Sequence, residues 1–296
     1  MTAKALDSVV AIDVHTHALA SVSEPMPVAN EGNKVLADYF GAPSIVPTVP
    51  DLARHYAEQR MMCVAFPVNT AWASGKEQRV SNDEICQQAA LFPDVIIPFC
   101  SVDPHGGRAA AKEVHRLAAE YPVKGLKFHP NTQEFFPDDR GVYPIYEAAQ
   151  EAGLVALFHS GQTGVGAGQR GGGGVRLKYS NPLHVDDVAV DFPDLKIILA
   201  HPSFPWQDEA LSIAGHKPNV FIDLSGWLPK YFPANLIQYA RTLLKRKVLF
   251  GSDYPAITAA RWLLEFDKLG FDDETRSLIL KDNAAELLGL TAQAAR

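Results

Sequence analysis

Eight short apolar runs recur along this chain, and their regular spacing constrains the fold more than any other feature of the sequence. They cover residues 9–17, 61–68, 95–103, 123–129, 154–159, 196–201, 220–225 and 247–253. Short apolar runs of this kind are typical of strands that are buried on both faces. Segments with helical patterning, such as 108–120, 143–152 and 182–191, separate the runs. Alternating strands and helices of this length predict parallel strands joined by right-handed crossovers.

Eight such units in a chain of 296 residues favour a closed (β/α)8 barrel, a TIM barrel, formed as a single domain over residues 1–296. The alternative is an open doubly wound sheet, which expects a glycine-rich dinucleotide-binding turn after the first strand. The first strand ends instead in His15-Thr16-His17. The sequence therefore predicts the barrel.

Two long loops are predicted at the carboxyl ends of the strands. A long insertion rich in Pro, Gly, Ser and Asn, Ala18–Pro50, follows the first strand and should lie over its carboxyl end. A glycine-rich loop, Gly161–Gly174, follows the fifth strand. It lacks the Gly-Lys-Ser/Thr of a phosphate-binding loop, and we interpret it either as a mobile lid or as a flexible linker. After the insertion, Asp51 is predicted to cap a helix that ends near Arg60, and Ser81 or Asn82 to cap the next one.

Composition and charge exclude several classes of protein. The formal net charge is -7 and the sequence pI is about 5.8, which does not favour nucleic acid or an anionic membrane surface as a partner. No apolar stretch approaches the ~18 residues that span a bilayer, and Met1–Ser8 lacks the apolar core of a signal peptide. Cys63, Cys86 and Cys100 are far apart and form no Cys-x-x-Cys pair, which favours a reducing compartment without structural disulfides. We expect a cytoplasmic protein.

Polar side chains end most of the predicted strands. The set comprises His15, His17, Lys127, His129, His159, His201, Asp223 and Asp253. In an α/β barrel the carboxyl ends of the strands form the active site. Residues two apart on a strand point the same way, so His15 and His17 should face one site. A single histidine at a strand end usually packs or faces solvent, but imidazoles and carboxylates at so many strand ends would be costly to bury without a cation.

A bound divalent metal ion explains this pattern. His15, His17, His159 and Asp253 supply three imidazoles and one carboxylate, which suits one zinc ion, with manganese as the alternative. Water activated by such a metal is available as a nucleophile near neutral pH. His201 is then the candidate general acid or base, and Asp253 is a second candidate for taking the proton of the attacking water. Asp253 also has a purely structural interpretation, as a carboxylate that bonds backbone N–H groups.

Six segments resemble the amidohydrolase superfamily and, within it, the amidohydrolase-2 group of TIM-barrel metal-dependent hydrolases. They are Asp13-Val14-His15-Thr16-His17, Gly125-Leu126-Lys127-Phe128-His129-Pro130, Phe158-His159-Ser160-Gly161, Leu199-Ala200-His201-Pro202, Leu249-Phe250-Gly251-Ser252-Asp253-Tyr254-Pro255 and Asp282–Leu288. Their order matches the family over nearly the whole chain. The resemblance implies that His15, His17, His159 and Asp253 hold the metal, that His201 is catalytic, and that the protein is a homodimer.

The resemblance leaves the reaction open. The group contains hydrolases that use metal-activated water on a carbonyl compound, and the stretch 201–232 resembles members that cleave a carbon–carbon bond of aryl β-ketoacyl-CoA compounds. It also contains decarboxylases of aromatic or muconate-type acids, similar to aminocarboxymuconate-semialdehyde decarboxylase. The first hypothesis is therefore a hydrolase in aromatic catabolism, the second is a decarboxylase (a lyase), and the third is a non-catalytic binding barrel.

Four residues are weaker candidates for contact with a small-molecule substrate. Lys127 and His129 share one face of the fourth strand, where Lys127 either pairs with a substrate carboxylate or bridges two metals as in binuclear relatives. Arg176 lies in the loop after the fifth strand and is a candidate for binding an anion. Trp227 follows the seventh strand and is a candidate wall of an aromatic pocket.

Overall fold

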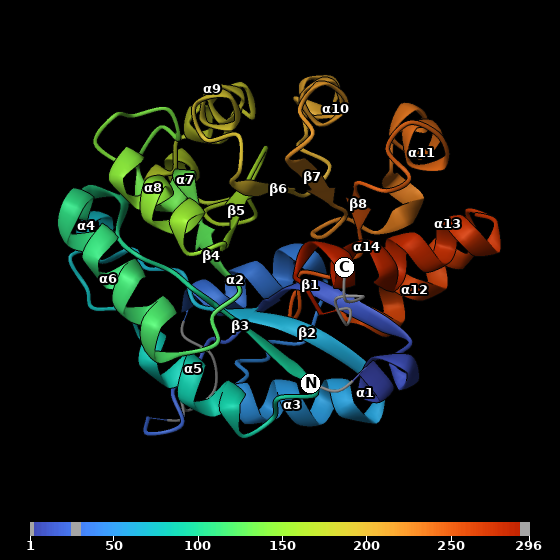
Figure 1. Ribbon diagram of the computed structural model, residues 1–296, viewed down its shortest axis with the longest axis horizontal. Helices are drawn as coiled ribbons and strands as arrows, with labels where there is room; N and C mark the ends of the chain where they lie inside the picture. The colour runs from blue at the N-terminus through green and yellow to red at the C-terminus, as the bar shows by residue number, and fades with distance from the viewer. Residues whose placement is uncertain (1–2, 25–30, 291–296) are drawn as a thin grey trace.

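The computed structural model describes residues 3–24 and 31–290. Its centre is one sheet of eight parallel strands in the sequential order β1 to β8, with the helices arranged around it (Figure 1). The strands are β1 (Ala11–His17), β2 (Met61–Phe66), β3 (Ile96–Cys100), β4 (Gly125–Phe128), β5 (Val155–His159), β6 (Lys196–Ala200), β7 (Val220–Asp223) and β8 (Val248–Leu249). The prediction of a parallel eight-stranded α/β barrel is confirmed.

Most of the helices lie in the connections between strands, and the others precede β1 or follow β8. The longer ones are α2 (Glu31–Phe40), α3 (Val49–Glu58), α5 (Asn82–Ala90), α6 (Gly107–Glu120), α8 (Tyr143–Glu151), α9 (Leu183–Asp191), α10 (Gln207–His216), α11 (Ala234–Arg241) and α12 (Ala259–Asp267). The shorter ones are α1 (Ala3–Ser8), α4 (Ala71–Ser74), α7 (Pro130–Gln133), α13 (Asp273–Ser277) and α14 (Asn283–Leu287), with the π-helical turn η5 (Leu278–Asp282) before α14. The 3₁₀ turns are η1 (Pro104–Gly106), η2 (Arg170–Gly174), η3 (Leu177–Ser180) and η4 (Pro229–Tyr231).

The barrel closes through the segment that follows β8 rather than through β8 itself. The N–H of Val14 donates to the carbonyl of Phe250 (3.0 Å), and the N–H of Asp253 donates to the carbonyl of His15 (3.0 Å). The predicted strand 247–253 is therefore wrong in length, since only Val248 and Leu249 pair regularly with β7. Asp253 has a positive φ of 71°, which an extended strand does not allow.

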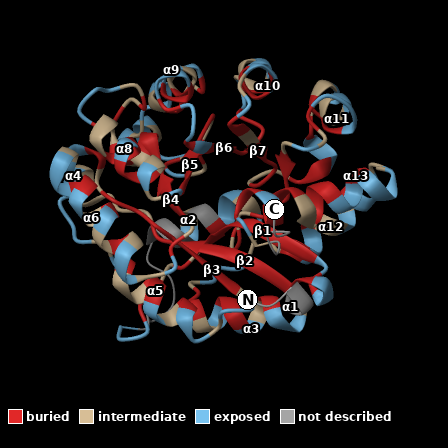
Figure 2. Ribbon diagram, viewed as in Figure 1, coloured by how far each residue is buried: buried red, intermediate tan, exposed pale blue. Residues whose placement is uncertain are grey.

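Apolar side chains fill two layers of core. One layer lies inside the barrel and includes Ile12, Val64, Phe99 and Leu157. The other lies between the strands and the helices and is much the larger. Figure 2 shows the result: the strands are buried along their length, while the helices expose their outer faces. Because interior positions near the amino ends of the strands are apolar, polar groups in the barrel are confined to its other end.

The insertion after β1 differs from the prediction in its local structure. Residues 25–30 lie outside the described residues, but Glu31–Phe40 form the helix α2, which the Pro- and Gly-rich composition did not indicate. The predicted cap at Asp51 is wrong, because α3 begins at Val49 and Thr48 is its N-cap. Asp51 instead completes a capping box, in which its side chain accepts the N–H of Thr48 (3.1 Å). The predicted cap at Ser81 is confirmed by its bond from the N–H of Glu84 (3.1 Å).

Cys63, Cys86 and Cys100 are buried free thiols. Cys86 and Cys100 are nevertheless neighbours, with their sulfur atoms 3.6 Å apart. In the described part of the chain no helix has both the length and the apolar character needed to cross a membrane.

Candidate functional site

A cavity of about 560 Å³ opens at the carboxyl ends of the strands. Eight residues singled out from the sequence line it: His15, His17, Lys127, His129, His159, His201, Trp227 and Asp253. Helix α2 contributes Tyr39 and Phe40 to the wall, so the insertion lies over the end of β1 as predicted. The predicted anion-binding residue Arg176 lies elsewhere: it is exposed, and its backbone carbonyl accepts a hydrogen bond from Asn131 (3.0 Å).

His15, His17 and Asp253 converge at the floor of this cavity. One ligand atom from each lies within 4.8 Å of the others. His17 Nε2 lies 3.0 Å from Asp253 Oδ1, and His15 Nε2 lies 3.5 Å from the same oxygen. An irregularity in β1 helps to bring these side chains together. The register of β1 against β2 shifts between Asp13 and Thr16. Val14 belongs to the core inside the barrel, and the next residue, His15, lines the cavity above it.

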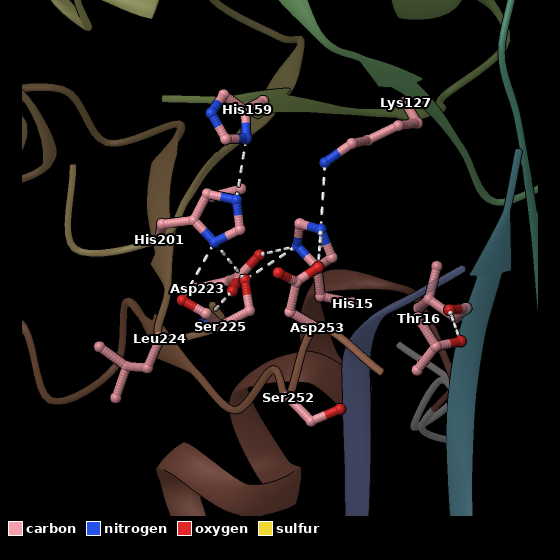
Figure 3. Close-up of polar contacts among 12 residues, drawn as sticks. His15, Thr16, Lys127, His159, His201, Asp223, Leu224, Ser225, Ser252 and Asp253 are labelled. Atoms are coloured by element: carbon pink, nitrogen blue, oxygen red, sulfur yellow. Dashed lines mark hydrogen bonds and ion pairs between the residues drawn. The ribbon is translucent and has the colours of Figure 1, made fainter. Parts of the chain in front are cut away.

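His15 is held in a fixed orientation by a carboxylate on β7. Its Nδ1 donates to Asp223 Oδ2 at 2.8 Å, and Ser225 Oγ lies 3.0 Å from the same nitrogen (Figure 3). A neutral imidazole carries one N–H, so this bond leaves Nε2 as the nitrogen with a free lone pair. A carboxylate behind an imidazole is the usual support of a metal-binding histidine.

His201 and His159 form a second hydrogen-bonded chain beside the first. His201 Nδ1 donates to the carbonyl of Ser225 (3.0 Å), so its Nε2 accepts the Nδ1 proton of His159 (2.9 Å). These bonds orient the two rings as Figure 3 shows. His159 Nε2 is then a bare lone pair, and this buried atom has no hydrogen-bond partner among the described residues. An orphaned buried nitrogen of this kind is expensive unless a ligand covers it.

The electrostatics of the floor suit a cation. Burial lowers the pKa of His15, His159 and His201, so their rings are neutral. A histidine that binds a metal must be neutral, which His15 and His159 therefore satisfy. Burial raises the pKa of Asp253, but its hydrogen bond to His17 and its electrostatic interactions with His15 and His201 outweigh this effect and hold the pKa of Asp253 well below its usual range. An anionic carboxylate among neutral imidazoles is the donor set that zinc or manganese takes. With the orphaned nitrogen of His159, the residues present fit one divalent ion.

Lys127 and His129 extend this floor along β4. Lys127 is fully buried, and its Nζ lies 3.2 Å from His15 Nε2 and 4.9 Å from the centre of the Phe66 ring. Burial lowers its pKa to about 7. The His129 ring stacks on His159, with ring centroids 4.0 Å apart, and its buried Nδ1 has no partner among the residues described.

Several residues that support the site could not be selected from the sequence. Asp13 accepts the N–H of His15 (3.0 Å) and of Ser252 (2.9 Å), and the hydroxyl of Tyr56 donates to it at 2.6 Å. This buried carboxylate therefore joins β1 to the loop that carries Asp253. Tyr56 belongs to α3 and Ser225 to the loop after β7, and no local pattern relates them to the histidines. Asp223 did carry a signal, since it ends an apolar strand.

The chain is similar in sequence to a known protein family and to one curated protein. The family model described as amidohydrolase (Amidohydro_2) matches residues 12–290. Among curated proteins, the protein fluG of Emericella nidulans is 34% identical over 55 residues, which are 19% of this chain and only 6% of that protein.

Three solved structures illustrate the likeness in fold. An uncharacterised TIM-barrel protein from Bordetella bronchiseptica is 22% identical with a TM-score of 0.76, covering 95% of this chain and 99% of its own. A 5-carboxyvanillate decarboxylase from Novosphingobium aromaticivorans, complexed with manganese and 4-hydroxy-3-methoxy-5-nitrobenzoic acid, is 16% identical with a TM-score of 0.66, covering 95% and 96%. A probable 2-pyrone-4,6-dicarboxylic acid hydrolase from Acinetobacter baumannii, with citric acid bound, is 16% identical with a TM-score of 0.61, covering 94% and 99%.

Proposed function

The chain belongs to the amidohydrolase-2 family, and on that premise we propose that it is a metal-dependent hydrolase of a small carbonyl compound. The observation that carries the proposal is the convergence of His15, His17 and Asp253 at the floor of the cavity. We assign His159 as the fourth ligand, through its orphaned Nε2. One zinc ion is the expected occupant, and manganese, which the Novosphingobium decarboxylase holds, is the alternative.

The metal, when bound, supplies a Lewis acid that acidifies water and polarises a carbonyl group. Asp253 is anionic at neutral pH and takes the proton of the attacking water. Asp253 then returns that proton to the leaving group, and His201 acts as a second base through the lone pair of Nε2, because its Nδ1–H is held by the carbonyl of Ser225. Lys127 lies beside His15 at the floor and pairs with an oxyanion of the substrate.

We further propose that the bond hydrolysed is a carbon–carbon bond of an aryl β-ketoacyl compound. Water adds to the ketone carbon, the bond to the neighbouring carbon breaks, and that carbon takes a proton. The products are a carboxylic acid and a shortened acyl compound. Trp227, Phe40 and Ile257 line the cavity and suit an aryl group.

Decarboxylation is the second candidate, and it is supported by a different observation. The Novosphingobium neighbour is a decarboxylase with an aromatic acid in its complex, and the cavity described above is walled by apolar side chains over the proposed metal site. In this reaction the carboxylate of the substrate leaves as CO₂ and a proton replaces it on carbon. The oxygen of water enters no product directly.

Metal content is the first test. Plasma mass spectrometry of the purified protein should find about one zinc or manganese per chain, and His15→Ala should lose it. His216→Ala is the matched control, since this exposed histidine lies at the end of α10. Two metals per chain would instead make Lys127 a bridging ligand, and no metal after reconstitution would contradict the proposal.

A substrate screen then separates the two reactions. The metal-loaded protein is incubated in H₂¹⁸O with a panel of aryl β-keto acids and thioesters and of hydroxybenzoic acids. Label in a new carboxylate supports hydrolysis, whereas CO₂ release with an unlabelled organic product supports decarboxylation.

A further inference from the structure

One charged side chain that lines the cavity lies outside the proposed metal site. Its other charged or imidazole side chains, those of His15, His17, Lys127, His129, His159, His201 and Asp253, belong to the floor described above. The remaining lining residues are neutral except Arg261. Arg261 lies in the first turn of α12, which follows the loop carrying Asp253.

The side chains that line the rest of the cavity are mainly apolar. Phe40 and Ile45 come from the insertion, Val165 from the glycine-rich loop, and Trp227 and Leu228 from the segment after β7. A ligand that binds both Arg261 and the floor must therefore present an apolar body to this wall.

Arg261 is exposed, and its guanidinium forms no ion pair with an acidic side chain of the described residues. No carboxylate oxygen of the described residues lies within 4.0 Å of it. Glu265, one turn further along α12, is engaged by Lys268 at 2.6 Å. The bond from Lys268 lowers the pKa of Glu265, with Lys230 and Arg261 adding to the effect. Arg261 is thus one of three cations that interact with this carboxylate, and the carboxylate is bonded to Lys268 rather than to Arg261.

The position of Arg261 on its helix is also unfavourable for stability. A cation in the first turn of a helix opposes the helix dipole, whose positive end lies there. Thr258 caps this end by accepting the N–H of Arg261 (3.3 Å). An anion bound at the guanidinium would be stabilised by both the side chain and the helix end.

We propose that Arg261 is a specificity residue that binds a second anionic group, distant from the metal, on an elongated substrate with an apolar middle. This inference rests on the proposed function, because it places the first anionic or carbonyl group at the metal floor. The substrate class is then an acid with an aromatic or aliphatic body and a terminal carboxylate or phosphate.

Chain-length series of simple acids test this inference. The manganese-loaded protein is titrated by calorimetry with α,ω-dicarboxylic acids of about eight to twelve carbons and with the ω-hydroxy acids of equal length. A third series ends in a phosphonate and distinguishes a phosphate from a carboxylate. The probes are compared in wild type, Arg261→Gln and the matched control Arg246→Gln, an exposed arginine before β8 at the opposite end of the barrel.

The dianionic probes should bind wild type about fivefold or more tightly than the hydroxy acids, at the length that spans the cavity. Arg261→Gln should abolish that preference and leave the hydroxy acids unaffected, while Arg246→Gln should keep it. Equal affinities at every length in wild type, or a preference that survives Arg261→Gln, would overturn the inference. Failure of the proposed function would give a different result. In that case all the acids would bind equally well with and without manganese.

Discussion

The Nδ1 atom of His15 lies 2.8 Å from Asp223 Oδ2, and both side chains are buried. The two residues are 208 positions apart in the chain and meet only because β1 and β7 end at the same mouth of the barrel. The carboxylate fixes the tautomer of the imidazole and aims Nε2 at Asp253 and His17. The candidate metal centre therefore depends on a residue that is not itself one of the proposed ligands.

Asp223→Asn should weaken metal binding while leaving the fold intact. An amide can present its N–H₂ group to Nδ1 and favour the wrong tautomer, and support residues of this kind typically contribute about 10- to 100-fold in metal affinity. Calorimetric titration of the metal-free variant with manganese measures the change, and circular dichroism checks the fold. Asp194→Asn, an exposed residue before β6, is the control. An unchanged affinity in Asp223→Asn would show that His15 needs no such support.

Gly226→Ala should impair the site through His201. Gly226 has a φ of +72°, and a Cβ at this position would lie 2.6 Å from His201 Nδ1. The ring would have to leave its bond with Ser225, so turnover on an identified substrate should fall by about 100-fold or more. Gly215→Ala is the matched control, because this glycine lies in α10 with open space around it. Equal activity in the two variants would contradict the proposed role of His201.

His201→Gln should keep the metal and lose most turnover. The glutamine can hydrogen-bond but cannot donate and accept a proton as an imidazole does, and this function is typically worth about 10²- to 10⁴-fold in rate. Metal content and steady-state rates of the same preparation separate the two effects. Loss of the metal would make His201 a ligand rather than the acid or base.

Tyr56→Phe should destabilise the protein without removing any proposed ligand. The variant leaves Asp13, whose pKa burial raises to about 7, without its shortest hydrogen bond. An unpaired buried polar group costs about 1–3 kcal/mol, so the free energy of unfolding should fall by that amount in a denaturant titration. Tyr179→Phe, whose ring packs on Phe136 with centroids 4.7 Å apart, is the control. A loss no larger than in this control would show that the other bonds of Asp13 suffice.

Much of the fold could be predicted from local pattern alone. Apolar runs of strand length alternate with helices, and that alternation already indicates a parallel barrel. Strand ends were less certain, because nothing in the run 247–253 marks the point after Leu249 where regular pairing with β7 ends, and apolar Phe250 continues the pattern. The helix α2 could not be predicted from a segment rich in helix-breaking residues, since its apolar face is stabilised by packing over the cavity rather than by propensity.

The sequence by itself determined which residue types stand at the ends of the strands, because each strand is a local run followed directly by its polar residue. That was enough to bring His15, His17, His159, His201 and Asp253 together as candidates. Only the tertiary structure decided how they are oriented: His15 is held by Asp223, His201 by Ser225, and Asp13 by Tyr56. It also placed Arg176 outside the cavity and Arg261 in its wall. These hydrogen bonds join segments that are far apart in sequence. They form because the barrel closes and its loops pack together, and no local sequence pattern encodes them.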